Sequence, residues 1–173
     1  MLKLETPRPG LLFVSFLYRS DLHTEESLTL EWEKYFGPTL KNIPAFNPLA
    51  DYYSKEMGSP LQRFFLASQK TFTRDYLLSA KLQMVGWENR WAQNEKRQVN
   101  IDVGFLTLEN FILATTKNYS HRVFIGENIF ADLTYQFQHG SFQMLPWTYP
   151  DYRDEKKLKF FVQLRNHLHD LLR

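Results

Sequence analysis

One stretch in the second half of the chain alternates between apolar and mostly polar side chains. In residues 129–138, IFADLTYQFQ, every second position is apolar: Ile129, Ala131, Leu133, Tyr135 and Phe137. A period of two places such side chains on one face of an extended strand. The apolar segment HRVFIG precedes this stretch, and the dipeptide His139–Gly140 supplies a two-residue turn into SFQML. The alternation therefore predicts an antiparallel β meander over residues 121–145.

The first third of the chain predicts a buried strand followed by a helix. The run LLFVSFLY, residues 11–18, is short, apolar and preceded by breaker residues, as is typical of a central strand. Thr24 is a candidate N-cap for a helix that Gly37 and Pro38 end. Four large side chains share one face of this helix: Leu28, Trp32, Tyr35 and Phe36.

The middle of the chain predicts further strands and helices. Residues 49–68 indicate two strands around the turn EMGSP, and residues 97–104 indicate another. Residues 73–93 predict a helix with Thr73 as its candidate cap. Residues 107–117 predict a helix from Thr107, although their β-branched content also fits a strand. A last helix is predicted over residues 153–173.

This order of elements favours an α+β fold built as a single domain, residues 1–173. The first six elements follow the β-α-β-β-α-β pattern of a ferredoxin-like core. An added antiparallel β meander extends the sheet, a C-terminal helix closes the chain, and helices are expected mainly on one face. The length of 173 residues is typical of one domain, and no repeat or linker interrupts it.

Composition excludes several classes of protein. The chain has no cysteine, which excludes disulfides, thiolate metal sites and cysteine nucleophiles. The formal charge of +2 argues against nucleic acid or an anionic membrane as a partner. The longest apolar run is too short to cross a bilayer, so we expect a soluble cytoplasmic protein. No nucleotide-binding, P-loop, zinc-protease or serine-hydrolase motif is present, and no cofactor is indicated.

The segment KNYSHR, residues 117–122, is the first candidate for a functional site. Lys117 and Arg122 suit a phosphate or carboxylate, and His121 suits proton transfer near neutral pH. Within a regular strand His121 and Arg122 would point to opposite faces, so they can serve one ligand only where the chain still turns. The alternative interpretation is a solvated turn leading into a strand.

Two other segments carry polar side chains at the ends of predicted strands. In VNID, Asn100 and Asp102 share one strand face, which suits a cleft but also a strand-end turn. In DYYSKEMG, residues 51–58, Tyr53 shares a face with Asp51, Glu56 adds a carboxylate, and Arg63 follows on the next strand. The alternative for this second segment is an aromatic edge strand whose charges face water.

The segment LPWTYPDY contains a rigid aromatic loop, residues 146–152. Its three aromatic residues, Trp147, Tyr149 and Tyr152, lie around two prolines, at positions 146 and 150. Such a loop can cover a pocket or a protein partner, or it can pack over the core as a lid on the last helix.

Together, DYYSKEMGSPL, VNIDVGFLTLENFILATTKNYSHRVFIG and LPWTYPDY make the chain similar to a bacterial family known as domain of unknown function 4416. The likeness extends from residue 11 to the last helix. The family has no established activity to transfer. Two departures are Val103, where the family usually has proline, and Phe105, where tyrosine is common. The resemblance implies that the family retains Asp51, Tyr52, Tyr53, Glu56, Met57, Gly58, Asn100, Asp102, Gly104, Thr115, Thr116, Lys117, His121, Arg122, Trp147, Tyr149, Pro150, Asp151 and Tyr152.

Polar residues in separate segments fit a shared cleft better than a core. We therefore expect an anionic small molecule, bearing phosphate or carboxylate, between segments 51–63, 100–104 and 117–122. Asp102 and His121 are the candidate catalytic residues, although binding alone fits the pattern too. The candidate ligand-binding residues are Arg63, Asn100, Lys117, Arg122, Tyr53 and Glu56. The alternative is a non-enzymatic interaction module that uses loop 146–152, and a third hypothesis is RNA binding by aromatic and basic side chains.

Overall fold

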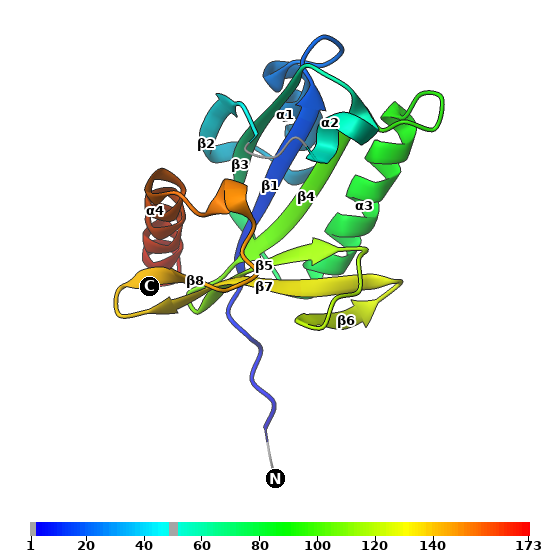
Figure 1. Ribbon diagram of the computed structural model, residues 1–173. Helices are drawn as coiled ribbons and strands as arrows, with labels where there is room; N and C mark the ends of the chain where they lie inside the picture. Colours follow the sequence, from blue (N-terminus) through cyan, green and yellow to red (C-terminus); the bar gives the residue numbers. More distant parts are fainter. Residues whose placement is uncertain (1–2, 49–51) are drawn as a thin grey trace.

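The computed structural model describes residues 3–48 and 52–173. Within them the chain folds as α+β, with one large antiparallel sheet and four α-helices (Figure 1). The strands are β1 (Gly10–Arg19), β2 (Thr39–Phe46), β3 (Leu61–Phe72), β4 (Val99–Leu106), β5 (Asn110–Thr115), β6 (Arg122–Gly126), β7 (Ile129–Gln138) and β8 (Ser141–Met144). The helices are α1 (Glu25–Phe36), α2 (Tyr52–Met57), α3 (Tyr76–Trp91), the short 3-10 helix η1 (Pro150–Tyr152) and α4 (Glu155–Leu171).

The described strands form one sheet in the order β2-β3-β1-β4-β5-β7-β6, and β8 also pairs with β7. All of these pairs are antiparallel. The predicted meander is present as β6, β7 and β8. Its register brings Val123 opposite Ala131 and Phe137 opposite Phe142.

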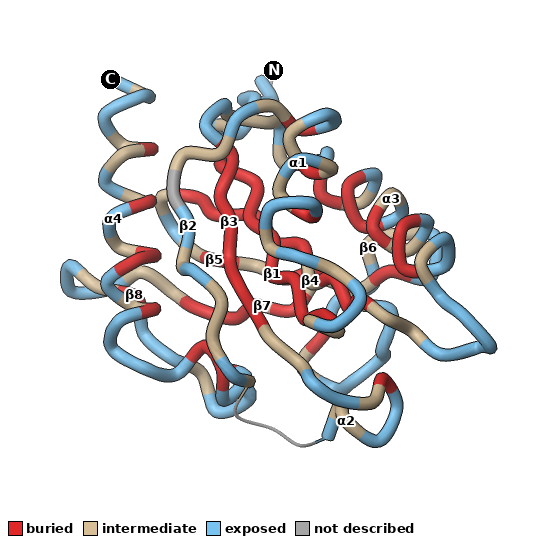
Figure 2. Tube along the Cα trace, turned by 90° about the horizontal axis from the view of Figure 1, so that it is seen from above, coloured by how far each residue is buried: buried red, intermediate tan, exposed pale blue. Residues whose placement is uncertain are grey.

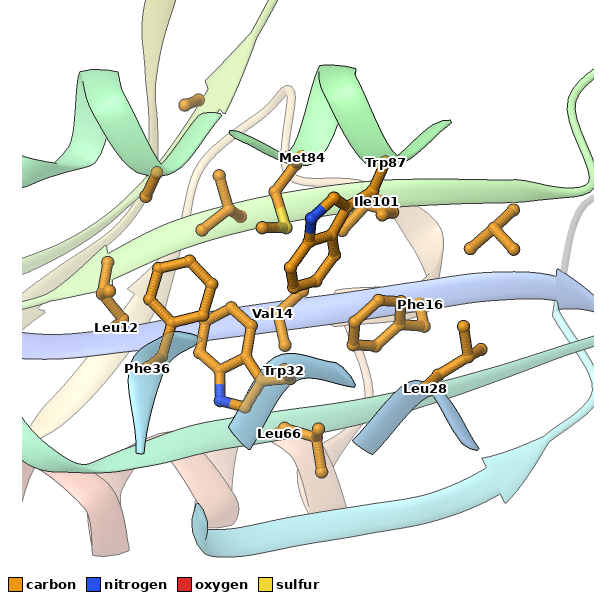
Figure 3. Packing of buried hydrophobic residues seen from close by; sticks show 14 of the residues in the cluster. Leu12, Val14, Phe16, Leu28, Trp32, Phe36, Leu66, Met84, Trp87 and Ile101 are labelled. Carbon is orange, nitrogen blue, oxygen red and sulfur yellow. The ribbon is translucent and has the colours of Figure 1, made fainter. Parts of the chain in front are cut away.

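Helices cover both faces of the sheet, so the prediction of helices mainly on one face is wrong (Figures 1 and 2). Strand β1 is buried from Gly10 to Tyr18, as predicted for a central strand. Its alternate residues Leu12, Val14 and Phe16 pack beneath α1 and α3 (Figure 3). Leu11 and Phe13 belong to the opposite cluster, which α4 covers.

Local signals explain the boundaries of α1. The Thr24 hydroxyl accepts a hydrogen bond from Ser27 N at 3.1 Å, and the Ser27 hydroxyl accepts one from Thr24 N at 3.3 Å. Gly37, at a φ of 78°, ends the helix in a conformation that side chains with a Cβ rarely adopt. Leu28, Trp32 and Phe36 are buried as predicted.

The helix predicted from Thr107 is wrong, because residues 110–115 form strand β5. The Thr107 hydroxyl does not cap a helix. It accepts hydrogen bonds from Asn110 N at 3.0 Å and Glu109 N at 3.2 Å, while Thr107 N donates to Asn110 O at 2.9 Å. These bonds close a tight hairpin turn that returns the chain beside β4.

Three other features of the first half differ from what the sequence predicts. The first strand expected in residues 49–57 is replaced by helix α2 over residues 52–57, and the candidate Asp51 lies outside the described residues. Strand β2 is not predicted by any pattern in the sequence. It is an edge strand that contains Pro44. Pro44 falls where the β2–β3 register shifts between Ile43 and Phe46, a position that tolerates the lost N–H. Finally, α3 begins after Asp75 rather than Thr73.

Candidate functional site

The sheet splits between β4 and β5. Strand β4 pairs with β1 from Val99 to Leu106, but with β5 only from Gly104 to Leu106. Beyond that point β5 continues beside β7, which crosses the direction of β1 and β4 in Figure 1. The two strands approach closely at Gly104, where a Cβ would lie 2.8 Å from Ile112 O. The split leaves one edge of residues 99–103 without a neighbouring strand in the described sheet.

Helix α3 supplies hydrogen bonds to that open edge. The Lys81 ammonium donates to Ile101 O at 2.8 Å, and Ile101 N donates to Glu88 Oε1 at 2.5 Å. Lys81 and Glu88 are seven residues apart, two turns along one helix face. Burial raises the pKa of the Glu88 carboxyl, and nearby Lys81 only partly opposes that effect.

A cavity of about 60 Å3 occupies the split, and we call it the wedge cavity. All of its lining residues carry a polar side-chain group, and they come from α2, α3, β4, the end of β5 and the loops beside them. They are Tyr53, Lys81, Glu88, Arg97, Asn100, Asp102, Thr115, Thr116, Lys117 and Tyr149.

A smaller cavity of about 30 Å3 lies beside it, lined by Tyr53, Arg63, Asp102, Tyr149, Pro150, Asp151 and Tyr152. The two cavities share Tyr53, Asp102 and Tyr149. A water molecule occupies about 30 Å3 in the liquid, so together they suit a small ion or one polar group of a larger ligand. Larger hollows exist, such as one of about 570 Å3 beside β2, but half of its lining residues are apolar, whereas every residue that lines the wedge cavity is polar.

Arg63 on β3 is buried and lines the smaller cavity. Its Nη1 donates to Ser15 Oγ at 2.7 Å and lies 3.2 Å from Asp102 Oδ2, while Nε lies 3.0 Å from Asp151 Oδ2. Burial alone would lower the pKa of Arg63, but the carboxylate of Asp102, followed by Tyr152 and Asp151, raises it overall. Arg63 is therefore a fixed cation held by two carboxylates.

Asp102 separates the two cavities. Its Oδ2 accepts hydrogen bonds from Arg63 Nη1 and, at 3.3 Å, from Asn100 Nδ2. Its Oδ1 makes no hydrogen bond to the described residues, and the side chain is 31% exposed. Burial, with Asp102 nearby, raises the pKa of Tyr53 to about 12, so Tyr53 keeps its hydroxyl proton at neutral pH. Asp102 thus brings an unused acceptor to the cavity wall.

Lys117, an exposed residue, brings a cation to the wedge cavity. Its backbone N donates to Thr115 Oγ1 at 3.2 Å, which fixes the turn after β5. The ammonium lies 5.7 Å from the centre of the Tyr52 ring. Within residues 3–48 and 52–173 no carboxylate lies within 4.0 Å of it. Lys117 is therefore available to a ligand.

The predicted residue Glu56 does not line either cavity. Arg97 binds it through two hydrogen bonds, Nε to Oε1 at 2.7 Å and Nη2 to Oε2 at 2.9 Å. The hydrogen bond from Arg97 lowers the pKa of Glu56. Arg97 Nη1 also donates to Asn100 Oδ1 at 2.7 Å. Glu56 therefore ties α2 to the cavity wall rather than facing its interior.

Comparison with known proteins identifies the family. The model of the family described as Domain of unknown function (DUF4416) matches residues 8–168. The chain belongs to this family. No curated protein and no solved structure matches the chain. Every residue that lines the wedge cavity lies inside the range that the family model covers.

His121 and Arg122 converge, but on a residue of their own chain. Residues 120–121 still form a turn, so His121 Nε2 lies 3.2 Å from Asp132 Oδ2 and Arg122 Nε donates to the same oxygen at 2.8 Å. The His121 ring also stacks on Trp147, with centroids 4.8 Å apart. Neither residue lines the wedge cavity. Arg122 reaches it indirectly, because its Nη2 donates to the Tyr149 hydroxyl at 2.9 Å.

The aromatic loop 146–152 is anchored to the sheet and forms part of the cavity walls. Trp147 Nε1 donates to Leu133 O at 2.8 Å, and Thr148 Oγ1 donates to Thr134 O at 2.7 Å. Tyr152 is 1% exposed and packs in the cluster beneath α4. Trp147 and Tyr149 remain partly exposed.

Lys81, Glu88 and Arg97 were not predicted from the sequence as cavity residues, whereas Tyr149 belongs to the aromatic loop that was expected to cover a pocket or a partner. A signal for the first two exists, because each directly follows a buried residue of the apolar stripe on α3, Ala80 and Trp87. Charged residues beside such a stripe lie at the border of the core.

In the described parts of the chain, no group of three or more histidine, aspartate or glutamate side chains is placed to hold a metal ion. None of the described helices has both the length and the apolar character required to cross a membrane.

Proposed function

We propose that the chain binds a small oxyanion, as a free ion or as the phosphate or carboxylate group of a small molecule, in the wedge cavity. The observation that carries the proposal is the composition of the walls, in which every lining residue is polar. Three cations, Lys81, Arg97 and Lys117, face two carboxyl groups, Glu88 and Asp102. This balance favours an anion.

Lys117 is the main anion contact in this proposal, because Lys81 and Arg97 already donate to protein acceptors. The hydroxyls of Thr115, Thr116 and Tyr53 and the amide of Asn100 supply further polar contacts on the same walls. Arg63 and Arg122 do not contact the ligand in this proposal. Arg63 holds Asp102 in place, and Arg122 holds the Tyr149 hydroxyl in place. If the bound molecule reacts, Asp102 is the group we assign as a base, since its Oδ1 is unused.

We further propose that β1, α1, β2, β3, α3 and β4 form a ferredoxin-like unit. Their strand order is β2-β3-β1-β4, with α2 inserted between β2 and β3. Strands β5–β8 and α4 would then be an addition within the same domain. The wedge cavity lies where the two parts join.

The interaction-module hypothesis has less support from the contacts of loop 146–152. Thr148 and Tyr152 are buried, and Trp147 is tied to β7. A partner could reach the exposed faces of Pro146, Trp147, Tyr149 and Pro150.

Isothermal titration calorimetry with inorganic phosphate and with acetate tests the proposal. We expect at least one of the two to bind the native chain, and Lys117→Met to weaken that binding by about tenfold or more, as for a lost charged hydrogen bond. Lys159→Met is the matched control, because Lys159 is exposed on α4 and lines neither of the two cavities. Failure of both anions to bind the native chain would refute the proposal, as would a Lys117→Met chain that binds like the native one.

A further inference from the structure

The wedge cavity contains an acceptor that an ordinary anion site would avoid. Asp102 Oδ1 has no hydrogen-bond donor among the described residues, while Oδ2 accepts from both Arg63 and Asn100. A carboxylate can only accept hydrogen bonds. An oxyanion that fills the space beside Oδ1 must therefore either donate a proton to it or suffer repulsion between two acceptors.

The second carboxyl group on the walls is already occupied. Glu88 Oε1 accepts from Ile101 N at 2.5 Å, and Glu88 Oε2 lies 3.5 Å from Arg97 Nη1. The free acceptor on the cavity wall is thus Asp102 Oδ1, and it belongs to a side chain that borders both cavities.

Oxyanions differ in whether they carry a proton to donate. Inorganic phosphate keeps at least one proton throughout the neutral range, whereas sulfate and simple carboxylates keep none. A phosphate monoester lies between them, because it loses its last proton with a pKa of about 6. Buried sites that pair a specific donor with a specific acceptor discriminate strongly against ligands that leave one group unpaired.

Resting on the proposed function, we infer that the site selects a protonated oxyanion, phosphate rather than sulfate or carboxylate, and that Asp102 Oδ1 makes the selection by accepting the ligand's proton in a hydrogen bond. Lys117 supplies the attraction for negative charge, and Asp102 supplies the discrimination. The ligand is then inorganic phosphate or a monoester in its singly protonated form.

Calorimetric titration of phosphate and sulfate into the native chain and into Asp102→Asn tests this inference. We expect the native chain to bind phosphate at least about tenfold more tightly than sulfate. In Asp102→Asn the amide can donate to sulfate while its oxygen still accepts from Arg63, so the preference should largely disappear. Asp170→Asn on the exposed surface of α4 is the matched control and should keep the native preference.

A second measurement keeps the inference testable if Asp102→Asn does not fold. Binding of methyl phosphate to the native chain should weaken as the pH rises through about 6, because the dianion has no proton to donate. Binding of inorganic phosphate should remain stronger than that of methyl phosphate at pH 8.

Each outcome has a separate meaning. Equal affinities for phosphate and sulfate in the native chain would overturn the selection while leaving oxyanion binding intact. An unchanged preference in folded Asp102→Asn would overturn the role of Asp102. Binding of acetate but of neither phosphate nor sulfate would also overturn the inference. Absence of any anion binding would instead refute the proposed function itself.

Discussion

Two polar regions lie next to each other at the end of β5, and they use their charges differently. The first is the arginine clasp, made of Arg122, Asp132, the Tyr149 hydroxyl and the Lys117 carbonyl. The second is the wedge cavity. The clasp and the cavity share Lys117 and Tyr149, so the two regions adjoin each other.

In the clasp each guanidinium nitrogen has a partner. Arg122 Nε donates to Asp132 at 2.8 Å, Nη1 to Lys117 O at 2.9 Å and Nη2 to Tyr149 at 2.9 Å, and its side chain is 2% exposed. In the wedge cavity the Lys117 ammonium and Asp102 Oδ1 have no such partner among the described residues. Charged groups are therefore common to both regions, and the unused donor and acceptor distinguish the wedge cavity, where we propose binding, from the clasp.

The largest expected effect comes from breaking the clasp. Arg122→Met removes the arginine partner of the buried Asp132 carboxylate, which keeps only the His121 ring nitrogen at 3.2 Å, and we expect the free energy of unfolding to fall by about 3–5 kcal/mol. Urea denaturation followed by circular dichroism measures the change. Lys117→Met should shift the free energy of unfolding by no more than about 0.5 kcal/mol. Similar losses for the two variants would show that the contrast between the regions is wrong.

A smaller effect is expected where the split in the sheet begins. In Gly104→Ala the new Cβ would meet Ile112 O at 2.8 Å and the Leu113 side chain at 2.9 Å, so the β4–β5 pair must shift. We expect a loss of about 1–3 kcal/mol in the same denaturation experiment. Gly86→Ala is the matched control, because a Cβ there meets nothing within 4 Å. Within helix α3 it should add up to about 1 kcal/mol of stability. A neutral Gly104→Ala would contradict the close approach of the strands.

The smallest effect concerns the pH dependence of stability. Burial raises the pKa of Glu88 above its value in the unfolded chain, so the unfolded chain loses this proton first as the pH rises. The contribution of Glu88 to stability is therefore complete below about pH 4.5 and is lost as the pH rises through the folded-state pKa. Glu88→Gln cannot titrate, so its stability relative to the native chain should increase over that range. Thermal melts at a series of pH values measure this difference, and parallel curves would contradict it.

Elements with a strong local pattern could be predicted from the sequence, and those fixed by distant partners could not. The meander follows from the alternation after Ile129, and α1 follows from Thr24 and Gly37. Strand β2 has no comparable pattern, because it is an edge strand interrupted by Pro44 and is defined by its pairing with β3. The error at Thr107 has the same origin, since its hydroxyl fits a helix cap and a hairpin turn equally well.

The candidate site shows the same division. Polar residues at strand ends were predicted to form the site, and three of them, Asn100, Asp102 and Lys117, line the wedge cavity together with Tyr53. Lys81 and Glu88 were not predicted as site residues, because only the apolar residues of their helix, α3, were used in the prediction. His121 and Arg122 were grouped with the site because they are close in sequence, whereas Asp132, on another strand, determines where they point.

The hydrogen bonds at Ile101 have a consequence for association between molecules. An exposed strand edge normally offers unpaired N–H and C=O groups to any passing chain, which is a route to aggregation. At Ile101 the backbone O accepts a hydrogen bond from the Lys81 ammonium and the backbone N donates one to the Glu88 carboxyl group. These two bonds replace the ones that a neighbouring strand would make. At Ile101 this edge of β4 therefore has no unpaired backbone group to offer to a second strand.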